Sequence, residues 1–224
     1  TNAGRVATVA NQAGASFANL AGATAGDVTN AGAVTNAGRV GTVDNQAGGS
    51  FKNLAGATAG AVTNAGTASN AGTVASLVNQ NGVFNNTGVI NGSATVNGGV
   101  LKTSGSIGGG LTNAGTVVAS GTIAGAITNN GTMSVVGNLD ATTGDVVQNA
   151  GAVLAVGGGT FRIAVGDLDN SGTVSVAGGA TLDVAKGDLL NKAGGVVSVA
   201  AGGTVVDDLD NAGTVTNNGS YTAD

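Results

Sequence analysis

The sequence predicts an all-β fold in which short strands stack, turn upon turn, as a β-solenoid. Three observations predict it: near-identical internal repeats, apolar and polar residues that alternate with a period of two, and an Asn-x-Gly unit that recurs throughout the chain. The composition agrees, because 43 of the 224 residues are Gly while Pro is absent and every acidic residue is Asp. With so few helix formers, strands and turns are favoured over helices.

The N-terminal part contains two copies of a 34-residue repeat. Residues 1–34 and 35–68 align without gaps and agree at 27 of 34 positions, and a diverged third copy follows. Solenoid turns take about 17 to 21 residues, so each repeat would form two turns. Phe17, Phe51 and Phe84 fall at almost the same phase of the three copies. We expect these rings to fill the core, either as a stack of similar rings or in alternate turns.

The C-terminal part repeats with a period of about 20 residues. In one copy the segments 173–176 and 181–184 alternate apolar and polar residues around a Gly-Gly turn, as half-buried strands do. Each strand is too short to build a core alone, so the copies must stack. We therefore predict near-identical repeats over residues 1–78 and turns of about 20 residues over 79–224. We expect both to form one continuous rod within a longer protein.

The Asn-x-Gly unit has the chemistry of a corner between strands. Asn tolerates the left-handed backbone conformation and can close an Asx-turn, and Gly accepts a positive φ without steric cost. Where identical corners stack at about 4.8 Å, their amides can hydrogen-bond from turn to turn as a ladder. The predicted corner and ladder residues are Asn113, Asn129, Asn149, Asn170, Asn191 and Asn211.

Composition excludes several functions. The net charge of −5, with seven Lys and Arg in all, argues against a nucleic-acid partner. The absence of Cys and His excludes disulfides, Cys/His zinc sites and His-based catalysis. No apolar run approaches the roughly 18 residues of a membrane span, so this segment is not expected to cross a membrane.

Two Asp pairs are the candidates for a metal site. Asp167 and Asp169 place carboxylates on alternate residues before Asn170, and Asp208 and Asp210 repeat that phase. The pattern is similar to the first half of a calcium loop, but Gly178 stands where an EF-hand has its Glu. We therefore favour solvent-facing corner residues over a calcium site.

Catalysis is the other site hypothesis, because β-helices can host polysaccharide lyases and hydrolases. Arg162 and Asp183 could meet across turns, and so could Lys186 and Asp208. Screened surface charge is the simpler explanation of these residues. With no His and no Glu, we expect no catalytic residue and no cofactor site in this segment.

The repeated units resemble a known family. NAGTV, NNGTM and NSGTV units, Gly-Gly turns, abundant Asn and Thr, and missing Cys resemble the passenger regions of bacterial autotransporter adhesins and filamentous-haemagglutinin-like exoproteins. The resemblance implies a right-handed parallel β-helix, exported to the bacterial cell surface or beyond. It also implies roles in adhesion, autoaggregation or biofilm formation. The Gly-Asp-Ser-Gly signature of protease passengers is absent, so the resemblance transfers no functional residue.

Three functional hypotheses follow. The first is an extracellular adhesive stalk whose partner is a host or neighbouring-cell surface, either glycan or matrix protein, or another copy of itself. The second is a self-polymerising filament or surface-layer subunit. The third is a polysaccharide-degrading enzyme. Fibre formation by the purified protein would favour the second hypothesis over the first.

Overall fold

The structure is a computed structural model that describes residues 1–223, and these residues form strands and turns without a helix. The chain forms two compact units, Thr1–Gly108 and Gly109–Asp224. Each unit is a parallel β-solenoid, with about 13 turns in the two together. The predicted all-β solenoid is therefore confirmed. The change of repeat length at residues 78–79 lies inside the first unit and does not coincide with the boundary between the units.

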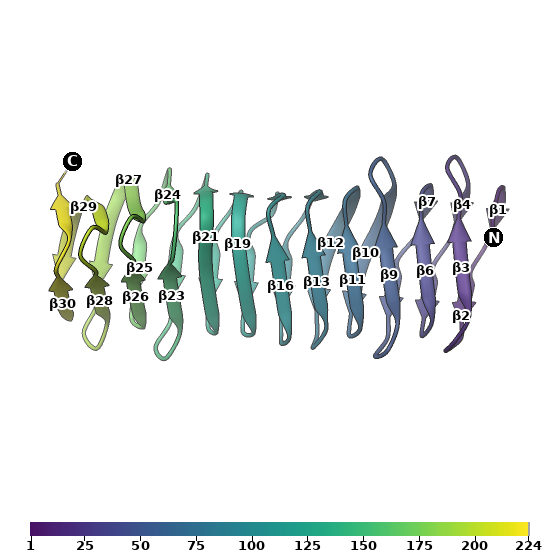
Figure 1. The fold of residues 1–224 in the computed structure, drawn as a ribbon, viewed down its shortest axis with the longest axis horizontal. Helices are drawn as coiled ribbons and strands as arrows, with labels where there is room; N and C mark the ends of the chain where they lie inside the picture. Colours follow the sequence, from purple (N-terminus) through teal and green to yellow (C-terminus); the bar gives the residue numbers. More distant parts are fainter. Residues whose placement is uncertain (224) are drawn as a thin grey trace. The chain divides into compact units, whose positions relative to one another are not determined.

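Three rows of strands, called A, B and C in the order in which each turn uses them, make up the first unit (Figure 1). Row A contains β1 (Arg5–Val6), β4 (Thr24–Ala25), β7 (Arg39–Val40), the first halves of β10 (Thr58–Asn64) and β12 (Thr73–Asn79), β14 (Val89–Ile90) and β17 (Ser106–Ile107). Row B contains β2 (Val9–Asn11), β5 (Val28–Asn30), β8 (Val43–Asn45), the second halves of β10 and β12, and β15 (Ala94–Val96). Row C contains β3 (Ser16–Asn19), β6 (Ala33–Asn36), β9 (Ser50–Asn53), β11 (Thr67–Asn70), β13 (Val83–Asn86) and β16 (Val100–Thr103).

The second unit has the same three rows. Row B contains β18 (Leu111–Asn113), β20 (Ile127–Asn129), β22 (Val146–Gln148), β25 (Leu168–Asn170) and the second halves of β27 (Thr181–Asn191) and β29 (Thr204–Asn211). Row C contains the first halves of β19 (Thr116–Ile123) and β21 (Thr132–Ala141), then β23 (Val153–Val156), β26 (Thr173–Val176), β28 (Val196–Val199) and β30 (Thr214–Asn217). Row A contains the second halves of β19 and β21, β24 (Thr160–Ile163), the first halves of β27 and β29, and β31 (Ser220–Thr222).

Strands of one row pair in parallel from turn to turn. In row C of the first unit, Asn36 pairs with Asn53, and Asn53 pairs with Asn70. Such a register repeats the same face of every strand, so one apolar position becomes a continuous buried column.

Turn length in the first unit alternates. Successive Asn residues at the ends of row B are 19, 15, 19 and 15 residues apart. One wide and one narrow turn therefore make up one 34-residue repeat, as the sequence predicts. In the second unit the bonded ladder residues are 16 to 21 residues apart. The narrow turns are shorter than the predicted 17 to 21 residues.

Two kinds of corner explain this alternation. A long corner such as Asn11-Gln12-Ala13-Gly14 contains a β-turn, in which Ala15 N–H donates to the Gln12 carbonyl at 3.0 Å. A short corner such as Asn30-Ala31-Gly32 closes instead when Gly32 N–H donates to Asn30 Oδ1 at 3.1 Å. Wide turns contain two long corners and narrow turns contain two short ones.

The role expected for the corner glycines is wrong in one respect. Positive φ occurs at the Gly of long corners, such as Gly14 with φ 78°, and at no non-Gly residue within 1–223. Gly32, in a short corner, has no positive φ. A Cβ on Gly32 would lie 2.3 Å from the Ala15 carbonyl oxygen and 2.4 Å from that of Gln12. Short corners thus require Gly because the preceding turn lies against them, and their Asn residues do not adopt the left-handed conformation.

Phenylalanines occupy alternate turns of row C in the first unit. Phe51 pairs with Val34 on one side and Ala68 on the other, and Phe84 lies between Ala68 and Leu101. Phe51 and Phe84 are fully buried. Of the two predicted arrangements, alternate-turn packing is the one observed, because a small neighbour makes room for each ring.

Candidate functional site

Two asparagine ladders run through the interior of the first unit. At the ends of row B, Nδ2 of one Asn donates to Oδ1 of the next at 2.7–2.8 Å. This column runs from Asn11 through Asn30, Asn45 and Asn64 to Asn79. At the ends of row C, the same bond links Asn2, Asn19, Asn36, Asn53, Asn70 and Asn86 at 2.8 Å. These side chains are buried, so the ladder supplies partners to amides that would otherwise lack them.

Both ladders end within the first unit. Asn86 Nδ2 donates to Thr103 Oγ1 at 3.1 Å, so a hydroxyl takes the last place in row C. In row B the residue in register with Asn79 is Val96, and Asn79 Nδ2 donates instead to the Gly98 carbonyl at 3.1 Å.

The second unit contains one ladder, at the ends of row B. Asn113 donates to Asn129 at 2.7 Å, and Asn129 donates to Oε1 of Gln148 at 2.8 Å. Asn170, Asn191 and Asn211 continue the column, joined at 2.8 and 2.7 Å.

Asn149 differs from the prediction, because it lies one residue beyond the ladder. Its Nδ2 bonds Asn130 Oδ1 at 2.6 Å in an exposed position, while Gln148 is 1% exposed and occupies the ladder. The local sequence Gln-Asn-Ala-Gly is a long corner with the first two residues of Asn45-Gln46-Ala47-Gly48 exchanged. That comparison is the sequence signal that identifies Gln148.

In row C of the second unit, the strands before β30 end on apolar residues where the first unit has Asn. Ala119, Val135, Val156, Val176 and Val199 occupy these positions and are fully or almost fully buried. The strand β30 ends on the exposed Asn217, in register with Val199. The outward side chains of this row are short and uncharged: Thr116, Val118, Thr132, Ser134, Val153, Ala155, Thr173, Ser175, Val196, Ser198, Thr214 and Thr216. This set, called the row C face below, is a regular surface of hydroxyls and methyl groups.

Charge is distributed unequally between the units. Residues 1–108 contain four Lys or Arg and two Asp, a net charge of +2, whereas residues 109–224 contain three Lys or Arg and ten Asp, a net charge of −7. Ion pairs within residues 1–223 are confined to the second unit, at Arg162–Asp183 (3.4 Å) and Lys192–Asp169 (2.9 Å). The contact suggested for Lys186 and Asp208 is not among them.

The four candidate calcium residues do not converge. Asp167 Oδ1 accepts the N–H of Asp188 at 3.0 Å, and Asp169 pairs with Lys192. Asp208 and Asp210 follow in β29, in register with Asp188 and Leu190. No group of three or more acidic side chains suited to a metal ion occurs in the part of the chain that the structure describes.

Asp207 is a buried carboxylate that the sequence analysis missed. It has no exposed surface, and its two oxygens accept the N–H of Leu189 at 2.9 and 3.0 Å. Tyr221 donates its hydroxyl to Asp207 Oδ2 at 2.9 Å. The corner before Asp208 is shorter than the one before Asp188, and the Asp207 carboxylate bonds to main chain of that preceding turn.

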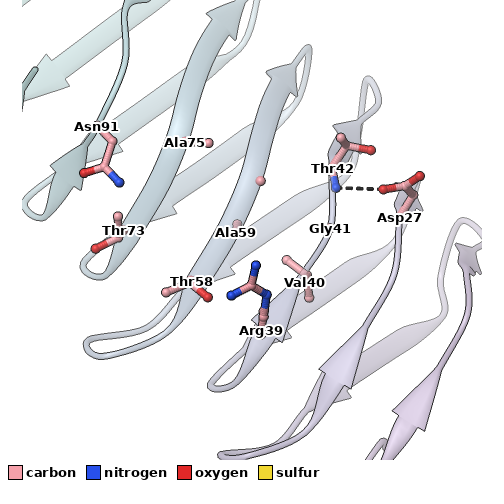
Figure 2. Close-up of a pocket in the computed structure, with 11 residues that line it drawn as sticks. Asp27, Arg39, Val40, Gly41, Thr42, Thr58, Ala59, Thr73, Ala75 and Asn91 are labelled. Carbon is pink, nitrogen blue, oxygen red and sulfur yellow. Dashed lines mark hydrogen bonds between the residues drawn. The ribbon is translucent and has the colours of Figure 1, made fainter. Parts of the chain in front are cut away.

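A groove crosses row A of the first unit, with a volume of about 460 Å³. Figure 2 shows Arg39 extending between Val40 and Thr58, with Asp27 at one end and Asn91 at the other. The floor includes Gly41 and Gly60, where a Cβ would lie 2.6 Å from Asp27 Oδ1 and 2.8 Å from the Gly41 carbonyl oxygen respectively. The missing side chains at Gly41 and Gly60 keep the floor of the groove low in two successive turns.

Asp27 is ionised and held in place by the neighbouring turn. Its Oδ1 accepts the N–H of Thr42 at 2.9 Å. Hydrogen bonds from the Thr42 side chain and main chain lower the pKa of the Asp27 carboxyl below its ordinary value. Arg39 lines the same groove but forms no ion pair with Asp27, since both ion pairs within residues 1–223 lie elsewhere.

A second, smaller hollow of about 170 Å³ lies in the second unit beside Lys192 and Asp210. Its cation is already paired with Asp169. The groove in the first unit, by contrast, has a cation that is not paired within residues 1–223.

The described residues contain no helix of the length and apolarity needed to span a membrane.

Fold and surface together define a parallel β-solenoid with repeated polar faces and one shallow, charged groove. No protein-family model matches the chain, and no curated protein matches it. Among solved structures it is similar to the TibC-catalysed hyper-glycosylated fragment TibA55-350, at 18% identity over 98% of this chain and 97% of that chain. The TM-score is 0.33, and the likeness assigns neither an activity nor a partner to this chain.

Proposed function

We propose that the chain is a structural and adhesive segment of a secreted bacterial surface protein, which mediates cell adhesion, autoaggregation or biofilm formation. The observation that carries the proposal is the row C face, where uncharged hydroxyls and methyl groups recur at every turn. A repeated surface offers many equal weak contacts, whose combined avidity exceeds that of any one of them. The family resemblance of the repeats supports the same function.

The proposal places the segment outside the cell, on a bacterial surface or released from it. A chain without Cys needs no disulfide formation to fold after export. Stacked turns with internal ladders stabilise the fold in place of disulfide bonds. Its proposed partners are a glycan or matrix protein of a host or neighbouring cell, or another copy of the chain.

The proposal also treats the segment as non-catalytic. Support comes from a composition without His, Cys or Glu and from charged side chains that bond to neighbouring turns, such as Arg162 to Asp183. Incubation with a panel of acidic and neutral polysaccharides tests this point, and chain shortening of any of them would overturn it.

Beads coated with the purified chain test adhesion directly, by counting beads retained on cultured bacterial and epithelial cells. The variant Ser175→Glu places a charge within the row C face, and Thr128→Glu places one on row B of the same unit. We expect retention to fall several-fold for Ser175→Glu and to persist for Thr128→Glu, because repeated contacts amplify a local defect. Retention no greater than that of uncoated beads would disprove the proposed function.

A further inference from the structure

The groove of the first unit contains a cation without a partner. Arg39 is exposed, forms no ion pair with any residue in the range 1–223, and lies on a unit with a net charge of +2. A guanidinium presents a planar set of donors that matches a carboxylate bidentately. The volume of about 460 Å³ lies within the range of small-ligand sites.

The remaining groups of the groove specify more than an anion. Thr42, Thr58, Thr73 and Asn91 line it with hydroxyls and an amide, which both donate and accept hydrogen bonds. No aromatic side chain lines it, so it has no stacking platform for a nucleobase or for the apolar face of a neutral sugar. Asp27 at one end of the groove would repel a second negative group of the ligand. Its carboxylate can instead accept hydrogen bonds from hydroxyl groups.

We propose that this groove binds a carboxylate-bearing saccharide, with the sugar carboxylate on Arg39 and the sugar hydroxyls on the Thr, Asn and Asp27 side chains. The inference rests on the proposed function and names the chemistry of one partner. A polyanion such as a nucleic acid fits poorly, because its regularly spaced charges would meet Asp27.

Comparison of the two repeats supports a site at Arg39 in particular. Arg5 occupies the equivalent position of the first repeat and belongs to the same row A column, in which Thr24 separates it from Arg39. Arg5 does not line the groove. Where the second repeat has Gly41 on the groove floor, the first repeat has Ala7, which carries a methyl group.

Titration calorimetry of the full chain with 3′-sialyllactose, which has a single carboxylate, and with its methyl ester as the matched neutral probe, tests the inference; methyl glucuronoside and methyl glucoside form a second matched pair. We expect binding of an acidic probe, at least about tenfold weaker binding of its neutral partner, and weakening at high salt. Arg39→Gln should lose at least about tenfold in affinity, and Arg39→Lys should lose less because it keeps the charge without the fork. Arg5→Gln should stay within about twofold of the parent.

Three outcomes would overturn the inference: no binding of either acidic probe, equal binding of acid and ester, or equal losses for Arg39→Gln and Arg5→Gln. Circular dichroism of each variant establishes that it is folded. The bead assay separates the two proposals. Adhesion without saccharide binding would disprove the groove and leave the adhesive function standing, whereas saccharide binding without adhesion would do the reverse.

Discussion

The two units build the same strand path with different interiors. The first unit buries two columns of Asn, whose amides bond from turn to turn. The second keeps one such column and fills the other with Ala and Val. A solenoid corner can therefore be held by a polar ladder or by apolar packing.

Where the two kinds of column meet, the last amide needs a partner other than the next ladder side chain. Asn79, in register with Val96, donates to the Gly98 carbonyl instead; without such an acceptor, a buried amide would remain unsatisfied at a cost of about 1–3 kcal/mol. The first unit ends its row C ladder on a hydroxyl, Thr103, which still accepts the last N–H.

The largest effect is expected from Asn53→Ala, in the middle of the row C ladder. Asn53 accepts from Asn36 and donates to Asn70, both at 2.8 Å, so its removal takes one acceptor from Asn36 Nδ2 and the ladder donor from Asn70 Oδ1, and it leaves a cavity in the buried column. We expect a loss of about 3–5 kcal/mol in the free energy of unfolding, measured with urea. Asn85→Ala, at a neighbouring position outside the ladder, should change it by less than about 0.5 kcal/mol.

The reciprocal change, Val156→Asn, tests the apolar column of the second unit. Val156 lies between Val135 and Val176, which offer an amide no hydrogen bond from their side chains. We expect a loss of about 2–4 kcal/mol by the same measurement. Unchanged stability would mean that the two interiors are interchangeable, contrary to the comparison.

Short-corner glycines are common to both units, and their replacement should cost about the same in each. A Cβ at Gly32 would lie 2.3 Å from the Ala15 carbonyl oxygen, and one at Gly172 would lie 2.5 Å from that of Ala152. We expect Gly32→Ala and Gly172→Ala each to destabilise by about 1–3 kcal/mol in thermal or urea unfolding. Gly4→Ala is the control: it changes the same motif at a position with no atom within 4 Å of the added carbon.

Added salt should stabilise the second unit more than the first, with a smaller effect than the substitutions above. Asp145, Asp167, Asp188 and Asp208 precede successive row B strands of the second unit, where their charges repel. Raising NaCl from 0.1 to 1 M shortens the Debye length from about 10 to 3 Å. We expect slower amide hydrogen exchange in the second unit, equivalent to about 1 kcal/mol, with little change in the first. Asp167→Asn, which keeps the Oδ1 acceptor for Asp188, should reduce that response.

The smallest expected effect concerns Asp27, one of two acids in the first unit. The pKa of Asp27 in the folded state lies below its ordinary value. Ionised Asp27 therefore stabilises the fold at any pH above that ordinary pKa. This contribution is lost as pH falls through the lowered pKa. An NMR titration should place the Asp27 midpoint below the ordinary Asp range, and Thr42→Val should move it back upward by removing the hydroxyl donor. A midpoint unaffected by Thr42→Val would assign the shift to the main-chain N–H alone.

Sequence patterns predicted what depends on neighbours along the chain. Period-two alternation located strands such as 173–176, and the 34-residue repeat indicated two turns. The recurring Asn-x-Gly located the short corners. Alternation and corner motifs depend on residues only a few positions apart, and a repeat is a direct match between two segments, which is why a single sequence reveals them.

Of the contacts between turns, the sequence analysis anticipated a ladder of corner amides and a pair between Arg162 and Asp183, but it did not predict features that depend on the detailed register. The clash that requires Gly32 involves Ala15, one turn earlier, and the place of Gln148 follows from its register with Asn129 and Asn170. The groove around Arg39 draws its lining from five successive turns. Until the corner lengths are known, the register between turns is undetermined, and so are these neighbours.

The pairing of wide and narrow turns has an evolutionary consequence. Unequal recombination between copies as alike as residues 1–34 and 35–68 gains or loses 34 residues at a time. Such an event keeps wide and narrow turns in alternation. It alters the length of the solenoid by two strand spacings, about 9.6 Å. A gain or loss of one turn alone would place two wide turns or two narrow turns side by side. The gene is therefore expected to lengthen or shorten by pairs of turns.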